Sequence, residues 1–207
     1  MLRNLFISII AMSMAMAVSA QGKYSPAFSD ELFGLSWDIN IPVNNNFTNK
    51  TSLDGFQVDY RKMIKHDLSV GVEINWASYE QYYPRKTYQI PNGAVTTDFY
   101  SYLYTFPLAV NVYHYFHANN MIFPYAGLAL GATYAEMKLY YNTYVSSDYN
   151  WGFLIRPELG AIVKFSENSS FGVLIGARYN YSTNTQSEFK INGIQSIGFQ
   201  LGLVALK

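Results

Sequence analysis

The sequence predicts an all-β chain, in which eight antiparallel strands follow one another up and down and close into a transmembrane β-barrel. Apolar and polar residues alternate along eight separate segments, which is the period of a strand whose two faces meet different surroundings. The segments span roughly ten residues or more, the length a tilted strand needs to cross a bilayer. The connections between them alternate between long and short, which is typical of barrels with both termini on one side of the membrane.

The first strand shows the alternation most clearly. Over Glu31–Val43, every second residue from Phe33 to Ile41 is large and apolar, and the residues between them are small or polar. The same pattern returns seven more times, with apolar faces over Phe56–Tyr60, Leu68–Trp76, Tyr100–Val112, Pro124–Tyr134, Trp151–Phe165, Phe171–Tyr181 and Ile197–Ala205. Pro107 and Pro157 fall inside two of these strands. Because a closed barrel offers a proline no free edge, bulges are expected there.

The connections indicate the orientation. The longer ones are expected at Asn44–Ser52, Glu80–Thr97, Met137–Asn150 and Thr183–Asn192, and the short ones at Lys62–Asp67, Phe116–Met121 and Ser166–Ser170. In outer-membrane barrels the tight turns face the periplasm and the longer loops face outward. We therefore expect the four longer connections to be extracellular loops.

The first twenty residues have the pattern of an export signal. Arg3 supplies a positive start, an apolar stretch follows, and Val18-Ser19-Ala20 offers small residues for cleavage. An uncleaved anchor helix is the alternative, but Ser8 and Ser13 interrupt the apolar stretch. The expected organisation is a signal peptide over 1–20, a short periplasmic segment over 21–30 and the barrel over 31–207.

Composition narrows the function. Lys plus Arg and Asp plus Glu each number 14, so the formal net charge is zero and nucleic acid is not an expected partner. There is no Cys, which excludes disulfides and thiolate chemistry. Charged residues make up 14% of the chain, compared with about a quarter of an ordinary soluble domain. Tyr is abundant, with 19 residues.

A soluble barrel with its apolar face turned inward is the main alternative fold. The apolar faces carry far more large side chains than a packed eight-stranded interior holds, which is roughly twelve. The opposite faces are rich in Gly, Ser and Asn, which suits a narrow lumen better than a solvated exterior. Tyr and Trp near the strand ends, such as Trp76 and Trp151, suit an aromatic girdle at the membrane interface. The membrane barrel is therefore favoured.

Three segments carry a resemblance to a known family: YTFPLAVNVYHYF from Tyr104, FPYAGLALGATY from Phe123 and IGFQLGLVAL from Ile197. With them, the chain from Glu31 to Lys207 resembles the small eight-stranded outer-membrane barrels of the OmpX and OmpA transmembrane type. It looks most like the compact barrels labelled porin-family or PorT-like. The resemblance implies residence in the bacterial outer membrane among lipid and lipopolysaccharide, and the PorT-like label implies a role as accessory to a protein secretion apparatus.

Five charged residues are expected at one level of the lumen. Counted from the periplasmic ends of the strands, Asp38, Glu73, Glu158 and Arg178 lie at similar heights on the inward faces, and Arg156 lies slightly above them. Buried charges are costly unless paired, so an ion-pair network is expected, with Arg178 neutralising the three carboxylates. It would act as a structural plug, or alternatively as a gated path for ions or protons.

Enzyme, cofactor and metal chemistry is not expected. His66, His114 and His117 lie at or beside the short turns, away from Ser146, Ser147, Asp148 and Ser187 in the expected surface loops, so no nucleophile has a base beside it. The sequence also lacks a Gly-rich phosphate loop and metal-ligand spacing.

Two of the expected extracellular loops are rich in tyrosine. The candidate binding residues are Tyr82, Tyr83, Arg85, Tyr88, Tyr140, Tyr141, Tyr144 and Tyr149. Tyr offers a large contact area at low entropic cost, although the same rings would also brace the loops. The sequence thus predicts a non-enzymatic, monomeric barrel with a structural or surface-interaction role, whose partner is a surface ligand or a secretion-system protein. A narrow transporter for small or apolar solutes remains the alternative.

Overall fold

The computed structural model describes residues 29–43, 47–90, 93–116, 120–141, 144–187 and 191–207. They form eight strands: β1 (Glu31–Val43), β2 (Ser52–Lys65), β3 (Leu68–Ile90), β4 (Gly93–Tyr115), β5 (Ile122–Tyr141), β6 (Tyr144–Lys164), β7 (Phe171–Gln186) and β8 (Ile191–Leu206). The expected signal peptide and most of the expected periplasmic segment lie outside the described residues. Within the described residues there is no helix of the length and apolarity needed to cross a membrane.

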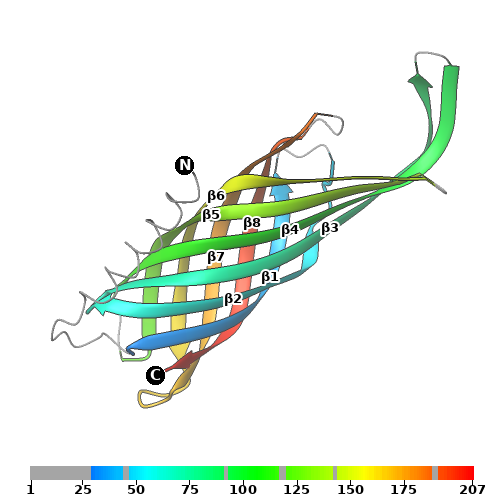
Figure 1. Ribbon diagram of the computed structural model, residues 1–207. Helices are drawn as coiled ribbons and strands as arrows, with labels where there is room; N and C mark the ends of the chain where they lie inside the picture. Colours follow the sequence, from blue (N-terminus) through cyan, green and yellow to red (C-terminus); the bar gives the residue numbers. More distant parts are fainter. Residues whose placement is uncertain (1–28, 44–46, 91–92, 117–119, 142–143, 188–190) are drawn as a thin grey trace, which may run out of the picture.

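The strands form a closed antiparallel ring in chain order (Figure 1). Each strand pairs with its neighbours in sequence, and the ring closes where β1 pairs with β8, from Leu32 opposite Leu206 to Val43 opposite Gln195. Closure leaves no free edge along the barrel wall, which is one of two ways a backbone satisfies its hydrogen bonds inside a membrane. The predicted fold class is confirmed.

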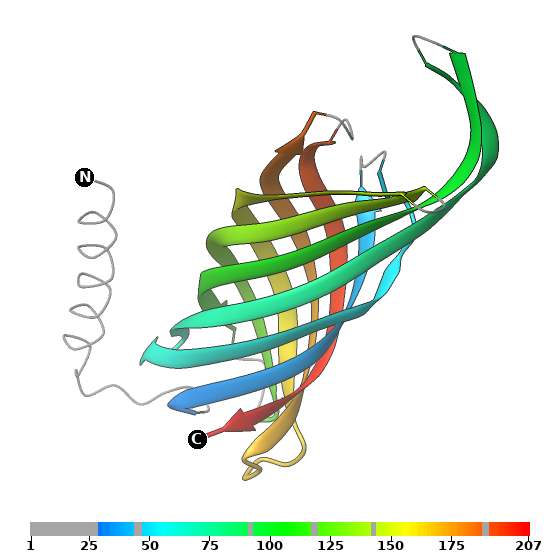
Figure 2. The ribbon, with the colours of Figure 1, turned by 45° about the vertical axis from the view of Figure 1, so that its right-hand side comes forward.

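The two ends of the barrel chain lie together at one end of the ring, visible in Figure 2 where β1 starts beside the C-terminus. The Ser29 hydroxyl shares its proton between the carbonyl oxygens of Glu31 and Lys207, which lie 2.7 and 2.8 Å from it. The Lys207 amide donates in turn to the Glu31 carbonyl at 2.9 Å. These bonds tie the first and last strands at the point where the ring would otherwise fray.

The two faces of the wall follow the predicted alternation. On β6, the Leu159 side chain is 66% exposed, whereas the adjacent Glu158 is 2% exposed. On β4, Val110 is 58% exposed and Ala109 is 8% exposed. The ring therefore presents large apolar side chains outward and polar or small ones to its lumen, the reverse of a soluble barrel.

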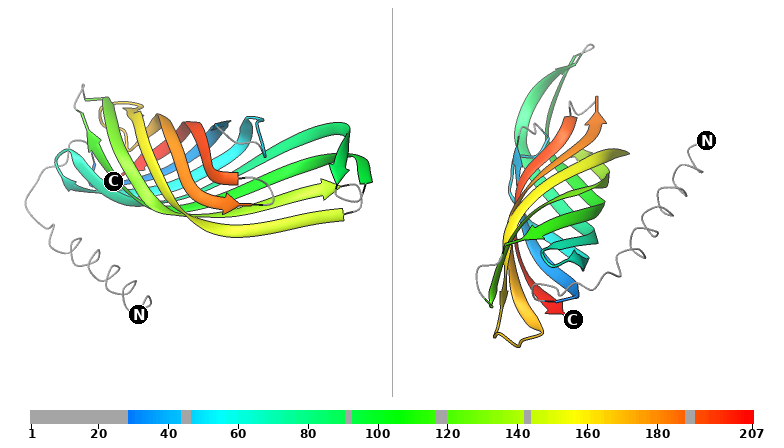
Figure 3. Two further views of the ribbon diagram at one scale, coloured as in Figure 1. Left: turned by 90° about the horizontal axis from the view of Figure 1, so that it is seen from above. Right: turned by 90° about the vertical axis from the view of Figure 1, so that its left-hand side faces the viewer.

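The structure corrects the expected extracellular loops. Glu80–Thr97 and Met137–Asn150 are extended β-hairpins: β3 and β4 remain paired up to Ile90 opposite Gly93, and β5 and β6 up to Tyr141 opposite Tyr144. Much of Thr183–Asn192 is likewise in β7 and β8, which pair up to Gln186 opposite Ile191. Figure 3 shows the β3–β4 hairpin extending farthest beyond the ring. The first two stretches contain several Tyr and Thr residues, which favour strands.

The expected bulges at Pro107 and Pro157 are absent. The β3–β4 ladder has a gap beside Pro107, and the β6–β7 ladder a gap beside Pro157, but the register is the same before and after each gap. Each ladder thus omits the pairs near its proline without inserting a residue. Register shifts occur instead between Asp38 and Asn40, Met63 and Lys65, Tyr83 and Lys86, and Ser182 and Thr185.

Candidate functional site: the barrel lumen and the surface hairpins

Apolar side chains fill the end of the lumen next to the termini. They come from the ends of the strands that meet there and are all buried: Leu32, Met63, Tyr113, Tyr115, Phe123, Tyr125, Ile162, Leu174, Val204 and Leu206. We call this set the lower apolar cluster. Side chains packed in this way occupy the interior of a narrow barrel in place of water.

A layer of buried charges lies above the lower apolar cluster. Arg178 Nη2 on β7 lies 2.5 Å from Asp38 Oδ2 on β1, and Arg156 Nη1 on β6 lies 2.8 Å from Glu73 Oε1 on β3. In each pair the two strands are not neighbours in the ring. Gln57 connects the two pairs, because its Oε1 accepts hydrogen bonds from both arginines. The charged layer thus links strands that share no backbone hydrogen bonds.

Two residues that the sequence reasoning omitted complete this layer. Arg61 on β2 donates from Nε to Asp59 Oδ2 at 2.7 Å, and both side chains are 1% exposed. Arg61 Nη2 lies 3.7 Å from Glu158 Oε1 on the opposite side of the ring. The inward alternation of Asp59 and Arg61 in the sequence was the signal that could have identified them.

The pairing within the layer differs from the expectation for Arg178. The sequence predicted that Arg178 would neutralise Asp38, Glu73 and Glu158 together. Among the described residues, the direct ion pair of Arg178 is with Asp38, whereas Glu73 pairs with Arg156 and Glu158 lies nearest to Arg61. The structure therefore brings the five predicted residues into one layer, but it distributes their charges over three arginines.

Two tyrosines join the lower apolar cluster to the charged layer, and two glycines make room for them. Tyr113 lies opposite Gly127, and Tyr125 lies opposite Gly160. A Cβ atom at Gly127 would lie 2.2 Å from the Tyr113 ring, and one at Gly160 would lie 2.5 Å from the Tyr125 hydroxyl. Each ring therefore lies flat over the neighbouring strand, and the Arg61 guanidinium stacks 3.9 Å above the centre of Tyr113.

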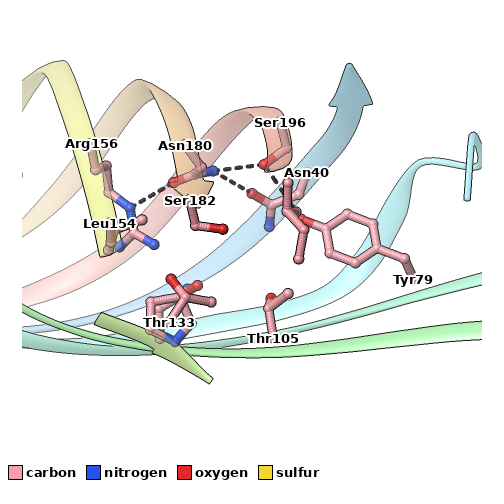
Figure 4. A pocket seen from close by; sticks show the side chains of 12 residues that line it. Asn40, Tyr79, Thr105, Thr133, Leu154, Arg156, Asn180, Ser182 and Ser196 are labelled. Atoms are coloured by element: carbon pink, nitrogen blue, oxygen red, sulfur yellow. Dashed lines mark hydrogen bonds between the residues drawn. The ribbon is translucent and has the colours of Figure 1, made fainter. Parts of the chain in front are cut away.

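A small polar cavity lies above the charged layer (Figure 4). Asn180 makes most of the hydrogen bonds in the cavity wall. Its amide donates to Ser196 Oγ at 2.9 Å and to Asn40 Oδ1 at 3.2 Å, and its Oδ1 accepts from Arg156 Nε at 2.6 Å. The cavity has a volume of about 20 Å³, which accommodates roughly one water molecule. It is too small for a solute.

A second apolar cluster closes the far end of the lumen. Its members are Phe47, Ala77, Tyr79, Leu103, Ala135, Met137, Leu139, Ile191 and Ile194. We call it the upper apolar cluster. Phe47 lies between β1 and β2 and reaches into the lumen, where its carbonyl accepts a hydrogen bond from the Ser101 hydroxyl at 2.7 Å. The lumen thus consists of a polar, charged middle between two apolar ends.

Beyond the ring, the tyrosines of the predicted binding set divide between two faces. Tyr83, Tyr88 and Tyr141 surround Phe99, with ring centres 4.6, 5.9 and 5.3 Å from it. Tyr88 is on this inner face because the bulge between Tyr83 and Lys86 shifts the alternation by one residue. Simple alternation would have placed it on the opposite face with Tyr82. The three inner tyrosines pack the hairpins together.

The outer face carries a separate row of tyrosines. Tyr82 lies 4.8 Å from Tyr100, which is followed along β4 by Tyr102 and Tyr104 with ring centres 6.4 and 6.1 Å apart. Tyr140 meets Tyr102 edge-on at 5.4 Å. This row continues from the barrel wall onto the hairpins. The Tyr82 hydroxyl donates a hydrogen bond to Asp98, which raises the pKa of the Tyr82 phenol.

The remaining candidates, Arg85, Tyr144 and Tyr149, are exposed. Tyr144 and Tyr149 are 78% and 68% exposed, and Tyr149 lies 6.1 Å from Tyr134 on the outer face. Arg85 lines a groove of about 400 Å³ on the β3–β4 hairpin. The other lining residues are Thr96, Thr97, Asp98, Phe99, Tyr100 and Tyr140. We call this the hairpin groove; its volume is within the range of ligand sites.

Catalytic and metal-binding groups do not converge in the part of the chain that the structure describes. His114 Nδ1 lies 3.4 Å from Asp67 at the end of the ring nearest the termini, and both side chains are about half exposed. His66 lies in the β2–β3 turn at the same end, and His117 is outside the described residues. The described ranges contain no cluster of three or more His, Cys, Asp or Glu side chains arranged for a metal.

Together, the closed ring, the outward apolar wall and the filled polar lumen have the architecture of a small outer-membrane β-barrel. No protein-family model matches the sequence, and no curated protein matches it.

Solved structures show the fold. The chain is similar to Neisserial surface protein A, with a TM-score of 0.59, 14% identity, and coverage of 86% of this chain and 98% of that one. It is also similar to Ail of Yersinia pestis in complex with the heparin analogue sucrose octasulfate, with a TM-score of 0.51, 15% identity and coverage of 86% and 98%. The outer membrane protease OmpT of Escherichia coli matches with a TM-score of 0.50, 8% identity and coverage of 76% and 67%. The predicted resemblance to small outer-membrane barrels is confirmed at the level of the fold.

Proposed function

We propose that the protein is a monomeric, non-enzymatic barrel of the bacterial outer membrane, whose plugged lumen supports hairpins that bind a ligand at the cell surface. One observation carries the proposal: buried apolar clusters close both ends of the lumen in the described chain, while four strands continue past the ring and carry exposed tyrosines. A filled barrel serves as a rigid support, and its interaction surface then lies on the hairpins.

The outer surface supports a location in a bilayer. Large apolar side chains on all eight strands are exposed there, which is unfavourable in water by about 25 cal/mol per Å² of apolar area. Aromatic pairs flank this belt near the far end, such as Tyr134 and Trp151 at 5.4 Å and Phe56 and Trp76 at 5.9 Å. Such pairs suit the membrane interface, and the immediate partners would be outer-membrane lipid and lipopolysaccharide.

The charged layer is proposed to act as a structural plug. Its three close ion pairs involve side chains that are at most 1% exposed, and apolar clusters lie on either side of it. A path for ions or solutes would need a continuous polar opening, and an eight-stranded barrel has little room for one. Transport of solutes through the lumen is therefore disfavoured.

The hairpin groove supports ligand binding. It presents tyrosine, threonine and one charge of each sign, Arg85 and Asp98, a composition that adaptable binding surfaces share. Ail binds the heparin analogue sucrose octasulfate, a polyanion. The groove offers too little positive charge for a polysulfated ligand, so we assign it a polar ligand of low charge, such as a neutral glycan.

The absence of enzymatic activity is part of the proposal, although OmpT shares the fold and is a protease. Hydrolysis by a nucleophile requires a base within hydrogen-bond reach. In the described part of the chain, His66 and His114 lie at the end of the ring where the two termini meet. The hairpins, at the opposite end, carry Asp98 and Asp148 without a histidine.

A truncated hairpin provides the test. Residues 84–98 are replaced by Asn-Gly, which joins the paired residues Tyr83 and Phe99 through a two-residue turn. The full chain and the truncated chain, both in detergent micelles, are applied to a printed glycan array and to a native envelope extract. Glycans bound by the full chain and lost on truncation support the proposal. Identical binding by the two chains overturns it, as does retention of envelope proteins alone, which would favour the secretion-accessory role.

A further inference from the structure

The buried layer contains more acids than bases. Within the described lumen it holds four carboxyl groups, Asp38, Asp59, Glu73 and Glu158, and three guanidinium groups, Arg61, Arg156 and Arg178. The only other buried cation among the described residues, Lys164, donates to the Glu167 carbonyl in the β6–β7 turn at 2.6 Å. One negative charge is therefore left over if every carboxyl group is ionised. A buried net charge is strongly unfavourable.

The excess falls on Glu158. Asp38, Asp59 and Glu73 each accept a hydrogen bond from one arginine. Among the buried carboxyl groups of the described chain, Glu158 alone has no such bond, because 3.7 Å to Arg61 Nη2 is beyond hydrogen-bond range. Its side chain is fully buried. It is the one acid of the layer without an arginine of its own.

The hydrogen-bond count around Tyr113 points to the same residue. The Tyr113 hydroxyl lies 3.3 Å from Glu73 Oε2 and 3.2 Å from Glu158 Oε2. A phenol has a single proton to donate, so it satisfies one of these two oxygens. The other contact becomes a hydrogen bond when Glu158 Oε2 itself carries a proton and donates it to Tyr113.

The other oxygen of Glu158 is arranged as an acceptor. Glu158 Oε1 receives hydrogen bonds from the Tyr125 hydroxyl at 2.8 Å and from Gln200 Nε2 at 2.5 Å. A protonated carboxyl group has one accepting oxygen and one donating oxygen. The surroundings of Glu158 match this division: two donors face Oε1, and one hydroxyl able to accept faces Oε2.

We propose that Glu158 holds a proton at neutral pH and donates it to Tyr113, which in turn donates to Glu73. The layer then contains three negative and three positive charges. One proton lies between Glu158 Oε2 and the Tyr113 oxygen, and another lies between the Tyr113 oxygen and Glu73 Oε2. The ligand of this site is a proton. The polar and charged groups around Glu158 are Arg61 on β2, Glu73 on β3, Tyr113 on β4, Tyr125 on β5, Arg178 on β7 and Gln200 on β8.

Infrared spectroscopy tests the proposal directly. The folded full chain is examined at neutral pH in a detergent that contains no carbonyl group, and the band of a protonated carboxylic acid is measured. We expect one such band, lost in Glu158→Gln and retained in Glu136→Gln, which alters a partly exposed acid outside the charged layer that is paired with Lys138. Tyr113→Phe should shift the band, because the acid loses its acceptor. A spectrum without the band, or a band that survives Glu158→Gln, overturns the proposal.

Stability gives a second readout that does not depend on a variant folding. A folded state that keeps one proton more than the unfolded state loses stability as pH rises. The unfolding equilibrium constant of the wild type should therefore rise about tenfold per pH unit above about pH 5, where an unfolded Glu is ionised. A flat profile between about pH 5 and 6 contradicts the proposal.

A bound cation would also balance the excess charge. Unfolding midpoints in sodium, potassium, magnesium and choline chloride at equal ionic strength distinguish the two. Equal midpoints support the proton, and a midpoint that rises with one metal ion overturns it. Glu158→Gln should leave the midpoint unchanged at neutral pH, because its amide replaces both the donor to Tyr113 and the acceptor from Gln200; a large loss of stability in a correctly folded Glu158→Gln chain also contradicts the proposal.

Discussion

Arg178 and Asp38 form an ion pair, with 2.5 Å between Nη2 and Oδ2, although their strands are separated by β8. Both side chains are fully buried. The backbone ladder connects β7 to β8 and β8 to β1, whereas this pair connects β7 to β1 directly. The charged layer therefore holds the ring together by contacts that the sheet does not make.

Removing the arginine of this pair should weaken the barrel. Arg178→Ala leaves Asp38 buried and without its arginine, a change that typically costs about 3–5 kcal/mol. We expect the free energy of unfolding, measured by urea titration in detergent, to fall by that order. A correctly folded variant migrates differently on detergent gels before and after boiling. Unchanged stability would mean that the ion pair does not contribute to the fold.

The matched control removes both charges. Asp38→Asn combined with Arg178→Gln leaves no unpaired ion, and replacing both partners of a buried pair costs much less than removing one. We expect the double variant to recover most of the loss seen in Arg178→Ala. A double variant as unstable as the single one would assign the loss to packing rather than to charge.

The contact between Gly127 and Tyr113 should also be sensitive to substitution. Gly127→Ala places a methyl group 2.2 Å from the Tyr113 ring, so the ring must move, and such overpacking typically costs about 1–3 kcal/mol. The free energies of unfolding of the wild type, Gly127→Ala, Tyr113→Leu and the double variant form a double-mutant cycle. We expect the alanine to cost less when the ring is absent; equal costs would show that the ring does not cause the strain.

The inner aromatic group around Phe99 should order the hairpins without stabilising the ring. Phe99→Ala removes the side chain that Tyr83, Tyr88 and Tyr141 surround. We expect faster protease cleavage within residues 80–98 and an unchanged gel shift on boiling. The control is Tyr102→Ala on the outer row, which should not speed cleavage. Equal cleavage of both variants would contradict the division between the two faces.

The orientation can be tested on living cells. Epitopes inserted near residues 92 and 142, between the paired strands β3 and β4 and β5 and β6, should be labelled on intact cells if the hairpins face the cell exterior as proposed. An epitope beside Asn168, in the β6–β7 turn, should be labelled only after permeabilisation. Reversed labelling would invert the orientation and place the tyrosine row in the periplasm.

The sequence predicts the strands and their faces well, since an alternating pattern is enforced by a wall with lipid on one side and a narrow lumen on the other. It is less informative about the ends of the strands. Glu80–Thr97 lacks a strongly apolar face, so it reads as a loop, yet it is paired almost throughout. The bulge before Lys86 then reverses the faces, and no residue pattern marks it in advance.

The charged layer was only partly predictable for a different reason. Heights counted along strands ignore the stagger between neighbours in a tilted barrel. They also ignore the length of arginine side chains. Arg61 follows the inward pattern, but its guanidinium reaches across the lumen toward Glu158, which residue counting cannot show. The sequence therefore predicted that Arg178 would pair with Glu73 and Glu158. In the structure Glu73 pairs with Arg156, and Glu158 lies nearest to Arg61.

Single-channel recording in planar bilayers tests the plugged lumen most directly. With two apolar clusters enclosing a layer of paired charges, the folded wild-type chain should produce no conductance steps above the bare bilayer in salt solution. Insertion is verified in the same membranes by protease protection of the barrel. Regular conductance steps from inserted wild-type protein would contradict a plugged lumen and favour a transport function.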